Sequence, residues 1–97
     1  MNREIKLVIL IEVQTGQADQ QIALYNKLKL LVLAESGCLQ YEMSRVTGSE
    51  VQFVLIESWK SQDALTLHDQ TLHMKEADAL SPSFRVGSAK VIQLFQL

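Results

Sequence analysis

Cysteine and clustered basic residues are nearly absent from this chain of 97 residues. Cys38 is the single cysteine, so no disulfide can form within the chain, and this usage fits a reducing compartment. The charged residues are scattered singly and sum to a net charge of −2. Because no basic stripe is present, a nucleic-acid partner is not expected.

Long apolar runs and cofactor motifs are also lacking. The apolar run Leu7 to Ile11 is too short to span a membrane, and no small-residue cleavage site follows it. The sequence contains no G-x-S-x-G, P-loop, G-x-G-x-x-G or C-x-x-C motif, so nothing indicates a nucleotide or flavin cofactor. We therefore predict a cytoplasmic protein with no membrane partner and no cofactor.

What the chain does have is hydrophobic content, at 47% of its residues. A chain of this length forms one domain, here residues 1–97, and a domain so small leaves much of its surface exposed when it is alone. The apolar excess therefore favours burial of some surface against another subunit.

The periodicity of the apolar residues defines the elements. Alternation predicts strands over 5–13, 38–46, 51–59 and 86–97. Helical spacing predicts a long helix over 18–34 and shorter helices over 61–68 and 72–80. Gly37 is expected to end the long helix with a positive φ, and Pro82 to stop the last one. The order β-α-β-β-α-β predicts an α+β ferredoxin-like fold, an antiparallel sheet with helices on one face.

The strands over 5–13 and 51–59 carry apolar residues on both faces. Because helices can cover only one face, the other is expected to meet the same face of a second copy. We predict a homodimer, a dimeric α+β barrel. Lysine in place of a sheet-face residue such as Ile9 or Leu55 is expected to break it.

Trp59 and His68 are the first candidates for a functional site. Trp59, the one tryptophan, is either a core residue at the end of the hairpin or a wall of a cavity for a flat apolar substrate. A neutral His68 can accept a proton from a substrate hydroxyl near pH 7, although a single histidine is more often solvated.

Other candidates have structural interpretations as strong as the functional ones. Glu57 shares an apolar face with Trp59 and needs either a wet cavity or a partner, which is Arg45, Lys60 or a residue of the second subunit. Tyr41 is either a core residue or a pocket hydroxyl. His68 and His73 form no H-x-H or H-x-x-x-H pair, and no carboxylate joins them at ligand spacing, so no metal site is predicted.

Three motifs occur in a characteristic order along the chain. Residues 35–41 read E-x-G-C-x-x-Y, residues 57–61 read E-x-W-x-S, and residues 64–73 read A-L-x-x-H-x-x-T-x-H. Together they resemble the antibiotic biosynthesis monooxygenase family over nearly the whole chain. This resemblance implies a dimeric α+β barrel with one pocket per subunit, and oxidation of quinols or polycyclic phenols by O₂ without metal or flavin.

The resemblance also assigns roles. It implies that Trp59 and His68 are catalytic, with Trp59 binding the ring or the oxygenated intermediate and His68 accepting the proton. Whether His73 accepts the proton instead stays open. It places Tyr41, Phe53 and Met74 in the wall of the pocket and leaves Glu57 and His73 as substrate-binding candidates.

Two other functions stay open at this point. Haem degradation is not one of them. The haem-degrading members of the family use an asparagine on the first strand, whereas this chain has Val8, Ile9 and Leu10 in that region. The family also includes an isomerase of a signalling sugar, and a non-redox enzyme of that kind is one alternative. The other is a dimer that binds a small molecule without chemistry.

Overall fold

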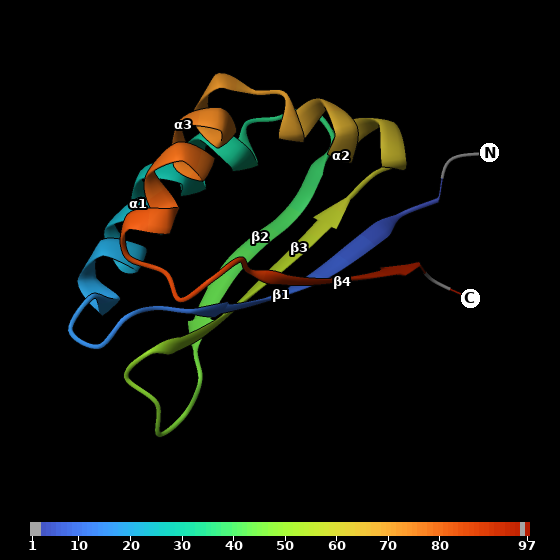
Figure 1. Ribbon diagram of the computed structural model, residues 1–97. Coiled ribbons are helices and arrows are strands. Elements are labelled where there is room, and N and C mark those ends of the chain that lie inside the picture. Colours follow the sequence, from blue (N-terminus) through green and yellow to red (C-terminus); the bar gives the residue numbers. More distant parts are fainter. Residues whose placement is uncertain (1–2, 96) are drawn as a thin grey trace.

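The computed structural model describes residues 3–95 and 97. It shows a four-stranded antiparallel sheet with the helices on one face (Figure 1). The strand order is β2-β3-β1-β4. The elements are β1 Ile5–Glu12, α1 Ala18–Leu33, β2 Cys38–Arg45, β3 Gln52–Trp59, α2 Gln62–Asp69, α3 Leu72–Leu80, a 3₁₀ turn Ser81–Ser83 and β4 Lys90–Phe95. The predicted ferredoxin-like α+β fold is confirmed, with the second helical segment divided into α2 and α3.

The side chains of the central strands alternate as the sequence predicts. Ile5, Leu7 and Ile11 of β1 are buried beneath the helices, opposite Trp59, Glu57 and Phe53 of β3. This register places the odd-numbered residues of both central strands on one face, because side chains alternate along a strand. The core and any cavity therefore lie between this inner face and the helices.

The last strand starts later than predicted, at Lys90 instead of Val86. Gly87 has a φ of +68°, a conformation outside the β region, and breaks the extension. Before that turn the chain pairs only briefly with the end of β1, where the Val86 N–H donates to the Glu12 carbonyl over 2.9 Å. The strand predicted over 86–97 therefore begins only after this turn.

The role predicted for Gly37 is wrong in its cause. Gly37 does follow the long helix, but the glycines with positive φ are Gly16, Gly48 and Gly87. A Cβ on Gly37 would instead collide with the Cβ of Ala64 in α2. The Gly37 carbonyl accepts from the Lys60 N–H over 2.8 Å, so the chain passes directly against the start of α2. Close packing, rather than backbone conformation, requires glycine here.

Gly37→Ala is therefore expected to lower the free energy of unfolding by about 1–3 kcal/mol, the usual cost of an added methyl group in a packed site. Urea unfolding measures it. The double variant Gly37→Ala/Ala64→Gly removes the opposing methyl group, so it should lose less stability than the two single variants summed. Strictly additive losses would contradict the steric explanation.

The outer face of the sheet lacks helices (Figure 1). Its exposed apolar side chains include Leu10, Ile92 and Leu94, at 40%, 41% and 45% exposure. Ile9 and Leu55, chosen from the sequence to test the dimer, lie instead on the inner face and line the cavity described below. The homodimer stays a prediction, and lysine substitutions that test it should be made at outer-face residues such as Leu10 or Ile92. Among the described residues, no helix has the length and hydropathy needed to cross a membrane.

Candidate functional site

A cavity of about 350 Å³ lies between the inner face of the sheet and the helices. That volume is near the lower end for pockets that bind small molecules, roughly 300–1,000 Å³. Most of its wall is apolar, from Leu7, Ile9, Ile11, Leu24, Leu28, Met43, Leu55, Leu65, Met74 and Val91. Its polar lining groups include Gln21, Tyr25, Tyr41, Glu57, Gln62, His68, Asp69, Asp78, Arg85 and Gln93.

Local sequence fixes His68 against this cavity. The Ser61 hydroxyl accepts from the Ala64 N–H over 3.2 Å and caps α2, the helix that carries His68. After α2, the Thr71 hydroxyl donates to the His68 carbonyl over 2.7 Å and ties down the end of the helix. The imidazole is 2% exposed and lies with its ring centre 4.4 Å from that of Trp59. His68 is therefore a rigidly packed histidine rather than a solvated one.

Glu57 is a second ionisable group that lines the cavity beside His68. Its Oε1 accepts the indole N–H of Trp59 over 2.9 Å and lies 4.0 Å from Nε2 of His68. Burial raises the pKa of the Glu57 carboxyl, while the Trp59 hydrogen bond and the nearby His68 act in the opposite direction. Within the chain, the partner of Glu57 is thus the tryptophan two residues away, and neither Arg45 nor Lys60.

The raised pKa gives stability a definite pH dependence. The pKa of Glu57 is higher in the folded protein than its ordinary value of 4.5. The stabilisation that this protonated carboxyl gives to the fold is therefore complete below pH 4.5, and it is lost as the pH rises through the raised pKa. Glu57→Gln keeps an acceptor for Trp59 but removes the titration, so its unfolding free energy should lack this decline. Urea unfolding across a pH series measures both proteins.

Glu42→Gln is the matched control, because Glu42 is an exposed carboxylate on β2. It should preserve the decline that Glu57→Gln removes. Parallel pH profiles for the wild-type protein and Glu57→Gln would show that Glu57 is not the group responsible.

The sequence-predicted site residues divide into two groups. Tyr41, Glu57, His68 and Met74 line the cavity, whereas Trp59, Phe53 and His73 do not. Trp59 is fully buried behind Glu57 and His68, so it has the core position that the sequence analysis left open. Phe53, 2% exposed, lies at the far end of β3 beneath the Arg45 guanidinium. Burial raises the pKa of the Tyr41 hydroxyl, which favours its neutral form.

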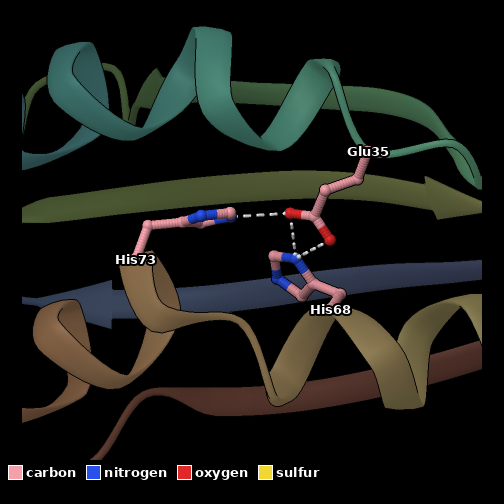
Figure 2. Close-up of side chains that lie close together, drawn as sticks. All are labelled: Glu35, His68 and His73. Carbon is pink, nitrogen blue, oxygen red and sulfur yellow. Dashed lines mark hydrogen bonds and ion pairs between the residues drawn. The ribbon is translucent and has the colours of Figure 1, made fainter.

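His73 meets His68 through a residue that the sequence analysis did not select. Glu35, in the turn after α1, lies between the two imidazoles, and the three side chains point toward one another (Figure 2). Oε2 of Glu35 is 2.9 Å from Nδ1 of His68 and 2.8 Å from Nε2 of His73. The carboxylate that joins the two histidines thus comes from a distant segment, 33 residues before His68, and not from ligand spacing in the sequence. The one available signal was that Glu35 opens the E-x-G-C-x-x-Y motif.

Arg85 is a second residue that the sequence analysis missed. Its Nε donates to the Gln21 side-chain oxygen over 3.0 Å, and both residues line the cavity. Burial lowers the pKa of Arg85, although the group stays a cation at any ordinary pH. No periodicity or spacing marks Arg85, because it follows the 3₁₀ turn in an irregular segment.

Cys38 is half-buried, and burial raises the pKa of its thiol. A raised pKa reduces the thiolate fraction, and the thiolate is the reactive form. Cys38 is therefore best explained as a packing residue.

The fold and this cavity define a small ferredoxin-like α+β protein with an internal cavity, and comparison identifies the family. The chain belongs to the antibiotic biosynthesis monooxygenase family, whose sequence profile matches residues 4–80. It is 30% identical over 71 residues to the protein named "Putative monooxygenase YcnE" of Bacillus subtilis, covering 73% of this chain and 75% of that protein.

Solved structures agree with this assignment. The structure of PA3566 from Pseudomonas aeruginosa is 27% identical, with a TM-score of 0.91 and coverage of 100% of this chain and 97% of that one. A structure from Caulobacter crescentus, titled as a putative antibiotic biosynthesis monooxygenase, is also 27% identical, with a TM-score of 0.92 and coverage of 99% and 92%. The resemblance seen in the three motifs is thereby confirmed at the level of the family.

Proposed function

We propose that this protein is a cofactor-independent monooxygenase that oxidises a quinol or a polycyclic phenol with O₂. The observation that carries the proposal is the placement of a buried imidazole, His68, and a buried carboxyl, Glu57, at one end of an apolar cavity. An aromatic ring fits the apolar walls, and its hydroxyl would meet a proton acceptor at His68.

In the proposed reaction, Nε2 of His68 removes the phenolic proton. Burial favours the protonated form of Glu57, whose hydroxyl can donate a hydrogen bond to a substrate oxygen as negative charge develops there. The electron-rich anion then transfers electrons to O₂. One oxygen atom enters a ring carbon–hydrogen bond of the substrate and the other leaves as water. The two electrons and two protons for that water come from the substrate itself, whose ring ends at the quinone level.

Other cavity residues have supporting parts in this proposal. Tyr41 and Met74 pack against the substrate ring, and the Arg85 cation faces its far edge. Trp59 does not touch the substrate in this proposal. Its N–H orients Glu57, and its ring packs against His68. The apolar walls shield the reacting pair from water.

The first test is O₂ consumption by metal-stripped protein with a panel of reduced quinones and polycyclic phenols, corrected for autoxidation. The proposal expects catalysed uptake with at least one member of the panel. Uptake no faster than autoxidation across the panel, from protein shown to be folded, would reject it.

A non-redox isomerase is the second candidate, favoured by the 4.0 Å separation between His68 Nε2 and Glu57 Oε1. Two groups so close can move a proton between adjacent positions of a small metabolite. Turnover that continues in the absence of O₂ would support this candidate over the oxygenase. The homodimer and the cytoplasmic location remain predictions in either case.

A further inference from the structure

The side of His68 that faces away from the cavity is held by a carboxylate that two imidazoles share. Glu35 comes from the turn after α1, His68 from α2 and His73 from α3, and all three side chains converge (Figure 2). Nδ1 of His68 lies 2.9 Å from Oε2 and 3.1 Å from Oε1 of Glu35. Glu35 and His73 are 15% and 21% exposed at their side chains, whereas His68 is 2% exposed. The cluster thus runs from the buried site toward the surface.

The distances favour hydrogen bonds over a shared metal ion. The three ligand atoms do lie within 4.8 Å of one another, which is close enough to consider a cation. Two ligands at about 2.0–2.1 Å from a tetrahedral zinc ion, however, are about 3.3 Å apart. The two Glu35–imidazole separations are 2.9 and 2.8 Å, the length of an N–H···O bond to a carboxylate.

Hydrogen bonding to Glu35 determines where each imidazole carries its proton. An ionised carboxylate offers only acceptors, so Nδ1 of His68 and Nε2 of His73 must be the donors. A neutral His68 then has its lone pair on Nε2, the nitrogen nearer to Glu57. Glu57 is the competing acceptor, but at 4.0 Å it makes no hydrogen bond, while Glu35 at 2.9 Å does. The contact with Glu35 therefore decides the tautomer.

We propose that Glu35 is a positioning residue that holds His68 in its Nδ1–H form and so keeps the Nε2 lone pair directed at the cavity, with His73 anchoring the same carboxylate from outside. The catalytic meaning of this arrangement rests on the proposed function, because it presents His68 as a base. The tautomer itself does not depend on any activity. Glu35 acts only through His68 and does not line the cavity.

The tautomer can be read directly by ¹⁵N NMR of the histidine side chains at neutral pH. In the wild-type protein, His68 should show a protonated Nδ1 and an unprotonated Nε2. In Glu35→Gln, which preserves size but offers an N–H donor and a weaker acceptor, a large part of the Nε2–H form should appear. Glu42→Gln, which changes an exposed carboxylate on β2, should match the wild type.

Three results would overturn the proposal. The first is a wild-type His68 protonated at Nε2, alone or at both nitrogens. The second is an unchanged spectrum in Glu35→Gln. The third is one equivalent of a metal in the purified protein that Glu35→Gln loses, since a metal would occupy Nδ1.

Activity provides a separate readout. With a substrate found in the O₂-uptake panel, Glu35→Gln should lower kcat at least tenfold with little change in KM, and Glu35→Asp, which retains the carboxylate, should recover part of the loss. A loss confined to KM would contradict positioning of the base. Absence of any substrate would reject the proposed function while leaving the NMR result to decide the role of Glu35.

Discussion

His68→Gln is expected to lower kcat by about 100- to 10,000-fold, the usual contribution of a general base. Glutamine fills much of the same space and can still donate to Glu35, but it has no basic nitrogen. Because His68 lines the cavity and is 2% exposed, solvent is poorly placed to replace it. Steady-state O₂ uptake with the best quinol of the panel measures the loss, and KM should change far less than kcat.

His73→Gln is the matched control for this variant. Both histidines bind Glu35, but only His68 lines the cavity. His73→Gln is therefore expected to retain most of the wild-type kcat. Equal losses in the two variants would show that the cluster supports the fold and that His68 has no special part in proton transfer.

Trp59→Ala is expected to cause the largest loss of stability, about 3–5 kcal/mol in the free energy of unfolding. Trp59 is fully buried at the end of β3, where its ring packs against His68 and its N–H satisfies Glu57. Alanine would leave a cavity and also leave a buried carboxyl without its donor. Urea unfolding followed by circular dichroism measures the change, since the protein loses its only tryptophan.

Trp59→Phe separates the two effects. Phenylalanine keeps most of the packing and removes only the N–H donor to Glu57. The free energy of unfolding should therefore fall by about 1–3 kcal/mol, which is less than the loss expected for alanine. A Trp59→Ala protein within about 1 kcal/mol of the wild type would contradict the buried position of the ring.

The sequence predicts the fold well because the physical signals for it are local. Alternation along β1 and β3 reports which residues share a face, and Ser61 and Thr71 both act as helix caps. Boundaries fail where a single backbone turn decides them, as Gly87 does for β4. Alternation identifies two faces but does not say which meets the helices, so Ile9 and Leu55 were placed on the wrong side.

The residues of the candidate site are harder to predict from the sequence, because they are brought together by contacts between distant segments. Glu35 is 33 residues from His68 and 38 from His73, and no spacing rule joins them. Gly37 shows the same limit, since its neighbour Ala64 is known only once α2 is in place. The three motifs gave the correct family, whereas the division of their residues between cavity and core required the fold.

The most direct test of the central claim is turnover under ¹⁸O₂ by metal-stripped protein, with product analysed by mass spectrometry. The account predicts one ¹⁸O atom in each product molecule, the second in water, and loss of this labelled product in His68→Gln. Product formed without the label, or at the same rate in the absence of O₂, would contradict oxygenation at this cavity.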